Sequence, residues 1–222
     1  MPASISHVLM PLSAAIIIRI VSIFGTEAVA AFSAGVSIER FATIPIMALA
    51  ASLLPFIGQN WGAGNFLRVK QATKNANIFI IFWGLLSAVI IAGIAPWIAN
   101  FFSKDPDVIK YLVMFLYIIP IAYAFRGICH NAYSAMNAIN HPYHSTINIL
   151  LRLFIFTIPL AALGAFIWGF RGLLFAIVLA EAASSIMTSR WVKKLYKHNI
   201  DKQKVFKDSS IETGVELCPV IE

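Results

Sequence analysis

Six apolar stretches dominate this sequence, and each is long enough to cross a lipid bilayer. A helix needs about 20 mainly apolar residues to cross the hydrocarbon core of a membrane. Residues 4–197 contain only five acidic side chains, and charged residues make up 12% of the whole chain. A soluble domain carries roughly a quarter charged residues to cover its surface. The composition therefore excludes a soluble globular domain and predicts a protein that crosses the membrane several times.

The apolar stretches are typical of helices, because they are continuous and lack the alternation of a membrane strand. We therefore predict an all-α fold with six membrane spans. The expected spans cover about residues 4–24, 28–56, 75–102, 108–136, 145–167 and 173–191. Residues 1–197 then form one transmembrane lobe. Residues 198–222 form a polar tail of mixed charge, which we expect to be disordered.

The distribution of basic residues predicts how the chain is oriented. Seven Lys or Arg residues lie in segments 68–74 and 190–197, whereas the opposite loops hold three. Cytoplasmic loops carry the excess of Lys and Arg in membrane proteins. We therefore expect a multi-pass protein of the cell's inner (plasma) membrane, surrounded by lipid, with both termini in the cytoplasm. The same distribution explains the net charge of +7 without a nucleic-acid partner.

The fourth span carries a polar stripe at helical spacing. Its residues lie three and four positions apart and therefore share one helix face. They are Tyr123, Arg126, His130, Tyr133 and Asn137. A charge at the centre of a span costs about 2.5–3.5 kcal/mol on insertion scales, so the stripe must avoid lipid. We expect Tyr123, Arg126, Tyr133 and Asn137 to line a substrate cavity. The alternative is that the stripe holds neighbouring helices together by hydrogen bonds.

Two acidic residues, Glu39 and Glu181, lie within the spans. A buried carboxyl group can carry a proton, and histidine titrates near neutral pH. Glu39, His130 and Glu181 are therefore the candidates for coupling transport to a cation. The alternative for each acid is a structural ion pair, for instance between Glu181 and Arg152.

The sequence shows no sign of enzyme chemistry. It has no GxxxxGK[ST] nucleotide loop, and its histidines are dispersed. The two cysteines, Cys129 and Cys218, match no metal-binding spacing. We therefore expect no enzymatic activity, no bound metal and no cofactor.

Several motifs in the chain match one transporter family in order and spacing. Residues 58–70 read GQNWGAGNFLRVK, which resembles the GQNxGAGxxxRV signature of the multidrug and toxic compound extrusion (MATE) family. The upstream segment 27–41 and the loop 102–109 also look like the corresponding parts of that family. Arg152 and Pro159 occupy the places of an Arg and a Pro in its next helix. The resemblance covers about residues 1–197.

The resemblance implies the carboxy-terminal six-helix lobe of a twelve-helix transporter. Such proteins export organic cations, drugs or dyes in exchange for H+ or Na+, and they hold the substrate between two lobes. An amino-terminal lobe is then missing or is supplied by a second chain. We expect a fragment, because Met1-Pro2 falls where a family member's chain would continue. In one branch of the family, acids for coupling lie in the first and fourth helices of this lobe, where this chain has none.

The sequence is also compatible with two other functions. One is a lobe of a lipid-linked sugar flippase from the same broader superfamily. The other is a membrane scaffold or fragment that transports nothing. Dye efflux distinguishes the exporter from both.

Overall fold

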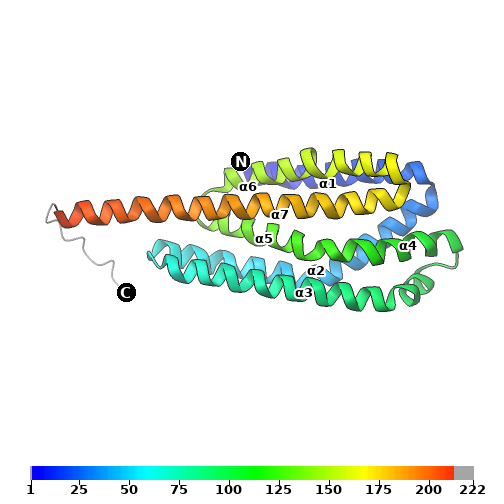
Figure 1. The fold of residues 1–222 in the computed structure, drawn as a ribbon, viewed down its shortest axis with the longest axis horizontal. Helices are drawn as coiled ribbons and strands as arrows, with labels where there is room; N and C mark the ends of the chain where they lie inside the picture. Colours follow the sequence, from blue (N-terminus) through cyan, green and yellow to red (C-terminus); the bar gives the residue numbers. More distant parts are fainter. Residues whose placement is uncertain (1, 213–222) are drawn as a thin grey trace.

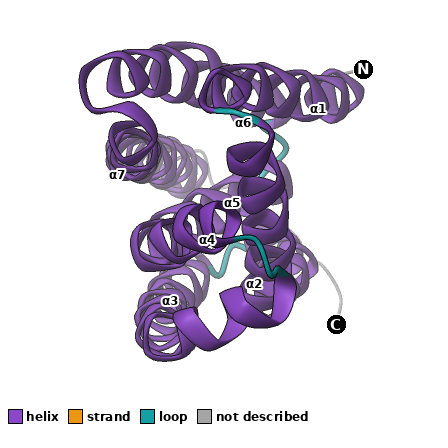
Figure 2. Ribbon diagram, turned by 90° about the vertical axis from the view of Figure 1, so that its right-hand side faces the viewer, coloured by secondary structure: helices purple, strands orange, loops and turns teal. Residues whose placement is uncertain are grey.

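The computed structural model describes residues 2–212, and it describes side chains for residues 10–197. Every regular element within residues 2–212 is helical, and the helices run up and down to form a bundle (Figures 1 and 2). The elements are α1 (Pro2–Val21), η1 (Ser22–Phe24), α2 (Thr26–Gly62), α3 (Phe66–Phe102), α4 (Pro106–Ile118), η2 (Ile119–Ile121), α5 (Ala122–Ala138), α6 (Pro142–Leu150), the π-helix η3 (Leu151–Thr157) and α7 (Ile158–Glu212). The prediction of an all-α membrane protein is confirmed.

Four continuous stretches in the described residues are long and apolar enough to cross a membrane. They are Thr26–Gly62, Phe66–Phe102, Pro106–Ala138 and Pro142–Lys197, and Met10–Phe24 is a shorter apolar helix. The last stretch holds two of the expected spans, because its backbone leaves helical geometry at Trp168 and Gly169. Helices α2 and α3 extend beyond the predicted spans 28–56 and 75–102. The polar residues after Phe56 continue the helix, since the chain leaves α2 only after Gly62.

The break at Trp168 and Gly169 reverses the chain direction (Figure 1). Gly169 has a φ of 61°, a left-handed conformation that glycine adopts without a steric penalty. The two arms then approach so closely that a Cβ atom on Gly164 would lie 2.3 Å from the Gly172 carbonyl oxygen. Glycine at both positions therefore permits this tight hairpin between the fifth and sixth passes.

The backbone of α7 continues as a helix to Glu212, whereas the sequence led us to expect disorder from residue 198. The chain has no glycine or proline between Gly172 and Gly214, so no residue there breaks the helix. Residues 213–222 of the expected tail lie outside the described residues.

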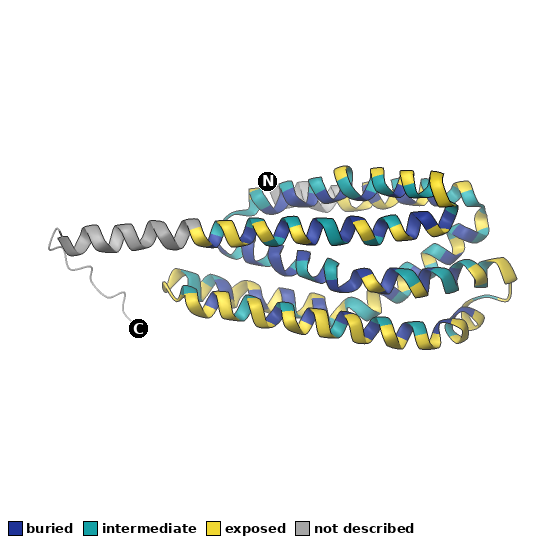
Figure 3. Ribbon diagram, in the orientation of Figure 1, coloured by how far each residue is buried: buried dark blue, intermediate teal, exposed yellow. Residues whose placement is uncertain are grey.

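The outer surface of the bundle is apolar, as a lipid-facing surface requires. On α3, Val89 is 72% exposed, Trp97 74% and Phe101 79%. The buried residues instead face the interior between helices (Figure 3). In the largest buried cluster, Phe115 packs edge-on against Phe32, with a ring-centroid separation of 5.3 Å. The interior thus joins α2 to α4 while α3 presents large side chains outward.

We predict that Gly84→Ala will lower the stability of the folded protein. A Cβ atom at Gly84 on α3 would lie 2.8 Å from the backbone nitrogen of Ala124 on α5, where a rigid backbone cannot give way. Overpacking of this kind typically costs about 1–3 kcal/mol. Thermal unfolding in detergent measures the effect. Gly93→Ala on the same helix is the matched control, because a Cβ atom there meets nothing within 4 Å. Equal unfolding temperatures for the two variants would contradict the prediction.

Candidate functional site

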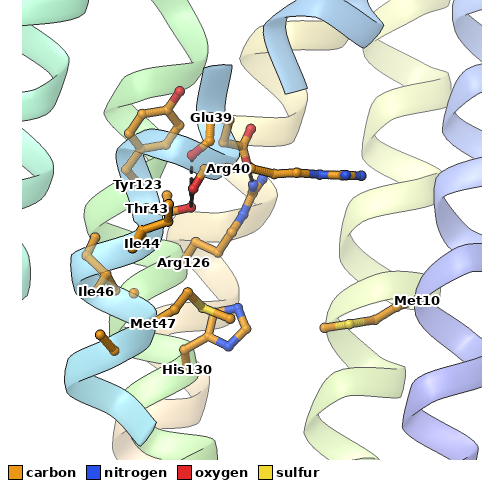
Figure 4. A pocket seen from close by; sticks show the side chains of 12 residues that line it. Met10, Glu39, Arg40, Thr43, Ile44, Ile46, Met47, Tyr123, Arg126 and His130 are labelled. Atoms are coloured by element: carbon orange, nitrogen blue, oxygen red, sulfur yellow. Dashed lines mark hydrogen bonds and ion pairs between the residues drawn. The ribbon is translucent and has the colours of Figure 1, made fainter. Parts of the chain in front are cut away.

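A pocket of about 550 Å³ opens on the side of the bundle where α1 and α2 face each other. Met10 lines it from α1, and residues 39–48 of α2 form one wall. Tyr123, Arg126, Gly127 and His130 line it from α5 (Figure 4). The pocket therefore combines apolar side chains with three basic groups, one tyrosine and one acid.

The α2 wall contains Pro45, which cannot donate a backbone hydrogen bond. In the turn before it, the Trp83 indole N–H of α3 donates to the Ala42 carbonyl at 3.0 Å. The Thr43 hydroxyl donates to the Glu39 carbonyl at 2.9 Å. These two bonds go to carbonyl groups in the turn before Pro45, near the Phe41 carbonyl that Pro45 leaves without its usual donor four residues on. The bond from Trp83 also ties this part of α2 to α3.

A network of four charged side chains begins in the pocket wall and continues behind it. Arg126 forms an ion pair with Glu39 of α2. The Arg126 Nε atom also donates to Glu181 Oε1 of α7 at 3.2 Å. The same carboxylate oxygen accepts from an Arg152 terminal nitrogen at 2.9 Å. Arg126 therefore links α2 to α7 through α5.

Arg152 lies in η3, where the helix widens into π geometry. The Thr157 hydroxyl donates to the Arg152 carbonyl, five residues earlier, at 2.8 Å. Pro159, two residues after Thr157, lacks a backbone N–H. π-helical segments are rare and occur frequently at functional sites. Here the segment places a buried arginine beside Glu181, whose exposed fraction is 1%.

The structure brings only part of the predicted polar stripe to the pocket. Tyr123, Arg126 and His130 line it. Tyr133 is buried in a cluster with Cys129, Ile149 and Leu153. Asn137 is exposed and does not line the pocket. The stripe therefore meets different neighbours along its length, and the transport roles of its residues stay predictions.

The candidate coupling residues also separate. Glu39 and His130 line the pocket, whereas Glu181 lies behind Arg126 and does not line it. Glu181 pairs with Arg152, the ion pair considered from the sequence as its structural alternative. No group of three or more His, Cys, Asp or Glu side chains in the described part of the chain is placed to hold a metal ion.

Sequence reasoning missed Arg40 as a pocket residue. Arg40 is exposed, lines the pocket and extends from α2 toward the side on which Met10 lies (Figure 4). Among the described side chains it has no hydrogen-bond or ion-pair partner. The sequence feature that could have identified Arg40 is its position next to Glu39, because two long side chains at adjacent positions can reach the same cavity.

Sequence reasoning also missed a polar contact between α3 and α5. The Asn131 amide donates to the Asn77 side-chain oxygen at 2.6 Å, and Asn131 is fully buried. The same amide lies 3.4 Å from the Thr73 carbonyl oxygen. Asn131 directly follows His130, so the spacing of three and four residues that defines the stripe leaves it out. The contact is an interhelical hydrogen bond of the kind expected if the polar residues of this helix hold neighbouring helices together.

The charges of the site do not cancel. Arg40, Arg126 and Arg152 supply three positive charges, and Glu39 and Glu181 supply two negative ones. With His130 neutral, one positive charge remains. That charge belongs to Arg40, because the other four side chains are linked by ion pairs.

Comparison with known proteins identifies the family. A family model described as MatE matches residues 2–163. Over 185 residues the chain is 38% identical to a FAD transporter of Shewanella oneidensis, and the match covers 83% of this chain and 41% of that protein. The crystal structure of the Vibrio cholerae MATE transporter VcmN in the bent form gives a TM-score of 0.86 at 30% identity, with 89% of this chain and 45% of that chain covered.

A more distant structure shows the same fold. An outward-facing multidrug resistance MATE family transporter of the MOP superfamily gives a TM-score of 0.85 at 19% identity, with 90% of this chain and 46% of that chain covered. The chain thus spans less than half the length of the relatives that it matches and corresponds to one lobe. These comparisons confirm the predicted family and a transporter rather than an enzyme. The chain belongs to the MatE family of multi-pass membrane transporters.

Proposed function

We propose that this chain forms one lobe of a secondary transporter that exports an anionic flavin nucleotide, the class to which FAD belongs. The observation that carries the proposal is the pocket, which joins an unpaired Arg40 and the pocket-facing Arg126 to apolar side chains of α1 and α2. Arginine suits phosphate recognition, because its planar fork binds two oxygens at once. Apolar walls suit a flat ring system. The 38% identity to a FAD transporter supports the same class of substrate.

The assembled transporter needs a second lobe. The chain covers 41% of the length of the FAD transporter and 45% of VcmN. Transporters of this architecture move one half against the other around a site between them. We therefore propose an amino-terminal six-helix lobe as the partner, on the open side of the pocket, with H+ or Na+ as the coupling ion.

A transport assay tests the proposal directly. Inside-out vesicles from cells that express the chain with the amino-terminal lobe of the FAD transporter should accumulate FAD when a proton or sodium gradient is imposed. Vesicles that contain the amino-terminal lobe alone are the control. Absence of FAD accumulation above that control, with both lobes present in the membrane, would overturn the proposed substrate. Absence of any transported substrate would favour a non-transporting scaffold.

Organic-cation export is the second candidate function. Glu39 gives the pocket an acid, and the Tyr123 ring lines the same pocket. A cation held on an aromatic face gains about 0.5–2 kcal/mol. The net positive charge of the site opposes this substrate class. Ethidium accumulation in the same vesicles distinguishes the candidates, because the flavin proposal expects FAD transport without ethidium transport.

We further propose that the loop 63–65 and the carboxyl end of α7 face the cytoplasm. Both lie at one end of the bundle, and the loop 103–105 lies at the other (Figure 1). In a background with Cys129→Ser and Cys218→Ser, a cysteine at Lys104 should react with an impermeant maleimide in intact cells, and one at Lys70 should not. Both lysines are exposed, so accessibility is matched. The reverse labelling pattern would invert the orientation.

A further inference from the structure

We propose that Glu39 is a displaceable internal ligand of Arg126, whose place an anionic group of the substrate takes on binding. This inference rests on the proposed function, since it assigns the contact made by the substrate's phosphate groups. It gives the pocket a mechanism by which an anion changes the contacts between helices. The occupant is a phosphate or pyrophosphate group, because that chemistry matches the arginine fork.

The two acids that bind Arg126 differ in how firmly they are held. The Glu181 side chain is 2% exposed and also accepts from Arg152 at 2.9 Å. The Glu39 side chain is 12% exposed, lines the pocket and has Arg126 as its ion-pair partner. When Glu39 separates from Arg126, its carboxylate stays in the pocket, where water can hydrate it. Removing Glu181 would leave charges buried behind the pocket, so Glu39 is the acid that an incoming anion displaces.

Arg126 is also placed to accept the new ligand without moving. Its Nε atom is used by Glu181, and a terminal nitrogen is used by Glu39. Its side chain is 21% exposed and forms part of the pocket wall. Glu181 therefore fixes the guanidinium while its other edge remains available to the pocket. Arg40 supplies a second cation in the same pocket, which a pyrophosphate group can bridge.

Displacement of Glu39 changes a contact between helices. Glu39 belongs to α2, and its ion pair with Arg126 links α2 to α5. Glu181, through which Arg126 links α5 to α7, does not line the pocket. An anion at Arg126 thus removes this ion-pair link between α2 and α5 and leaves the link between α5 and α7 in place. A ligand shifts a conformational equilibrium only through such differential contacts.

Binding assays with matched ligands test the proposal in vesicles that contain both lobes. Glu39→Gln keeps the side-chain size and removes the competing charge. We expect it to tighten FAD binding about five- to tenfold, in the range typical of coupled sites. Binding of riboflavin, which has the same ring and no phosphate, should not change. With FAD held well below its Kd for each protein, inorganic pyrophosphate should displace FAD from the variant at a correspondingly lower concentration. Maximal FAD transport should fall, because the α2 contact no longer re-forms.

Glu27→Gln is the control for loss of an acid from α2. Glu27 lies in the first turn of α2 and does not line the pocket. It should leave binding of FAD, riboflavin and pyrophosphate unchanged. Equal tightening of FAD and riboflavin by Glu39→Gln, or no tightening of FAD or pyrophosphate, would overturn the displacement.

The two proposals fail in different ways. If the wild-type protein binds pyrophosphate more weakly than Glu39→Gln but neither transports FAD, displacement stands and the flavin substrate is wrong. If FAD is transported but Glu39→Gln changes the affinity for neither FAD nor pyrophosphate, displacement is wrong and the proposed function stands. If neither protein binds pyrophosphate or FAD, both are wrong.

Discussion

Glu181→Gln should remove most of the folded protein from the membrane. The substitution leaves Arg152 buried without an acidic partner among the described residues, while Arg126 keeps Glu39. The Arg152 side chain is 8% exposed, so water cannot replace the lost carboxylate. Breaking a buried ion pair by removing one partner typically costs about 3–5 kcal/mol. That is comparable to much of the total stability of a folded domain. Protein abundance in isolated membranes and thermal unfolding in detergent measure the loss.

The removal of both charges separates an ion-pair effect from a packing effect. Glu181→Gln combined with Arg152→Gln should recover much of the abundance, because no unpaired arginine remains at η3. Ser185→Ala is the control on the same helix, since its hydroxyl donates to the local Ala182 carbonyl, at 2.9 Å, and not to the charged network. Wild-type abundance and unfolding temperature for Glu181→Gln would show that the network does not stabilise the fold.

The helical passes were predictable because hydrophobicity is a local property of the sequence. Each apolar stretch ends near a polar or glycine-containing segment, and each lies within the helices, although α2, α3 and α7 extend past the stretches. Polarity alone does not predict where a helix ends, because that end depends on helix breakers. The polar residues after Phe56 stay helical to Gly62, and α7 runs on through residues 198–212 for the same reason.

The candidate site was predictable only in part. Spacing on one helix put Tyr123, Arg126 and His130 on one face, because a 3.6-residue period defines a face, and these three line the pocket. The spacing could not show which neighbouring helix each part of that face contacts along the length of α5. Tyr133 therefore lies against residues of α6 and η3 rather than in the pocket. The Arg126–Glu39 pair joins residues far apart in the chain, and no local period encodes such a contact.

Replacement of Arg126 should abolish most FAD transport while the protein remains in the membrane. Arg126→Gln leaves Glu181 paired with Arg152, and it leaves Glu39 facing the pocket, where water can reach it. Arg126→Gln should therefore lower the stability of the fold less than Glu181→Gln does. The substrate loses charge-assisted hydrogen bonds, each worth about 1.5–3 kcal/mol, which corresponds to roughly 10- to 150-fold in binding. Arg126→Lys should not restore transport, because one ammonium group cannot bridge Glu39 and Glu181 as the guanidinium does.

A double-mutant cycle shows whether Arg126 and Glu39 act through each other. Residues in direct contact have non-additive effects, and independent residues have additive ones. In the Arg126→Gln background, Glu39→Gln should no longer tighten FAD or pyrophosphate binding, because the cation for which Glu39 competes is gone. FAD binding and transport in vesicles with both lobes, normalised to protein level, provide the four values of the cycle. If Glu39→Gln tightens anion binding equally with and without Arg126, then Glu39 repels the anion by its own charge. The ion pair would then only join α2 to α5, and Arg40 would be the pocket's anion-binding residue.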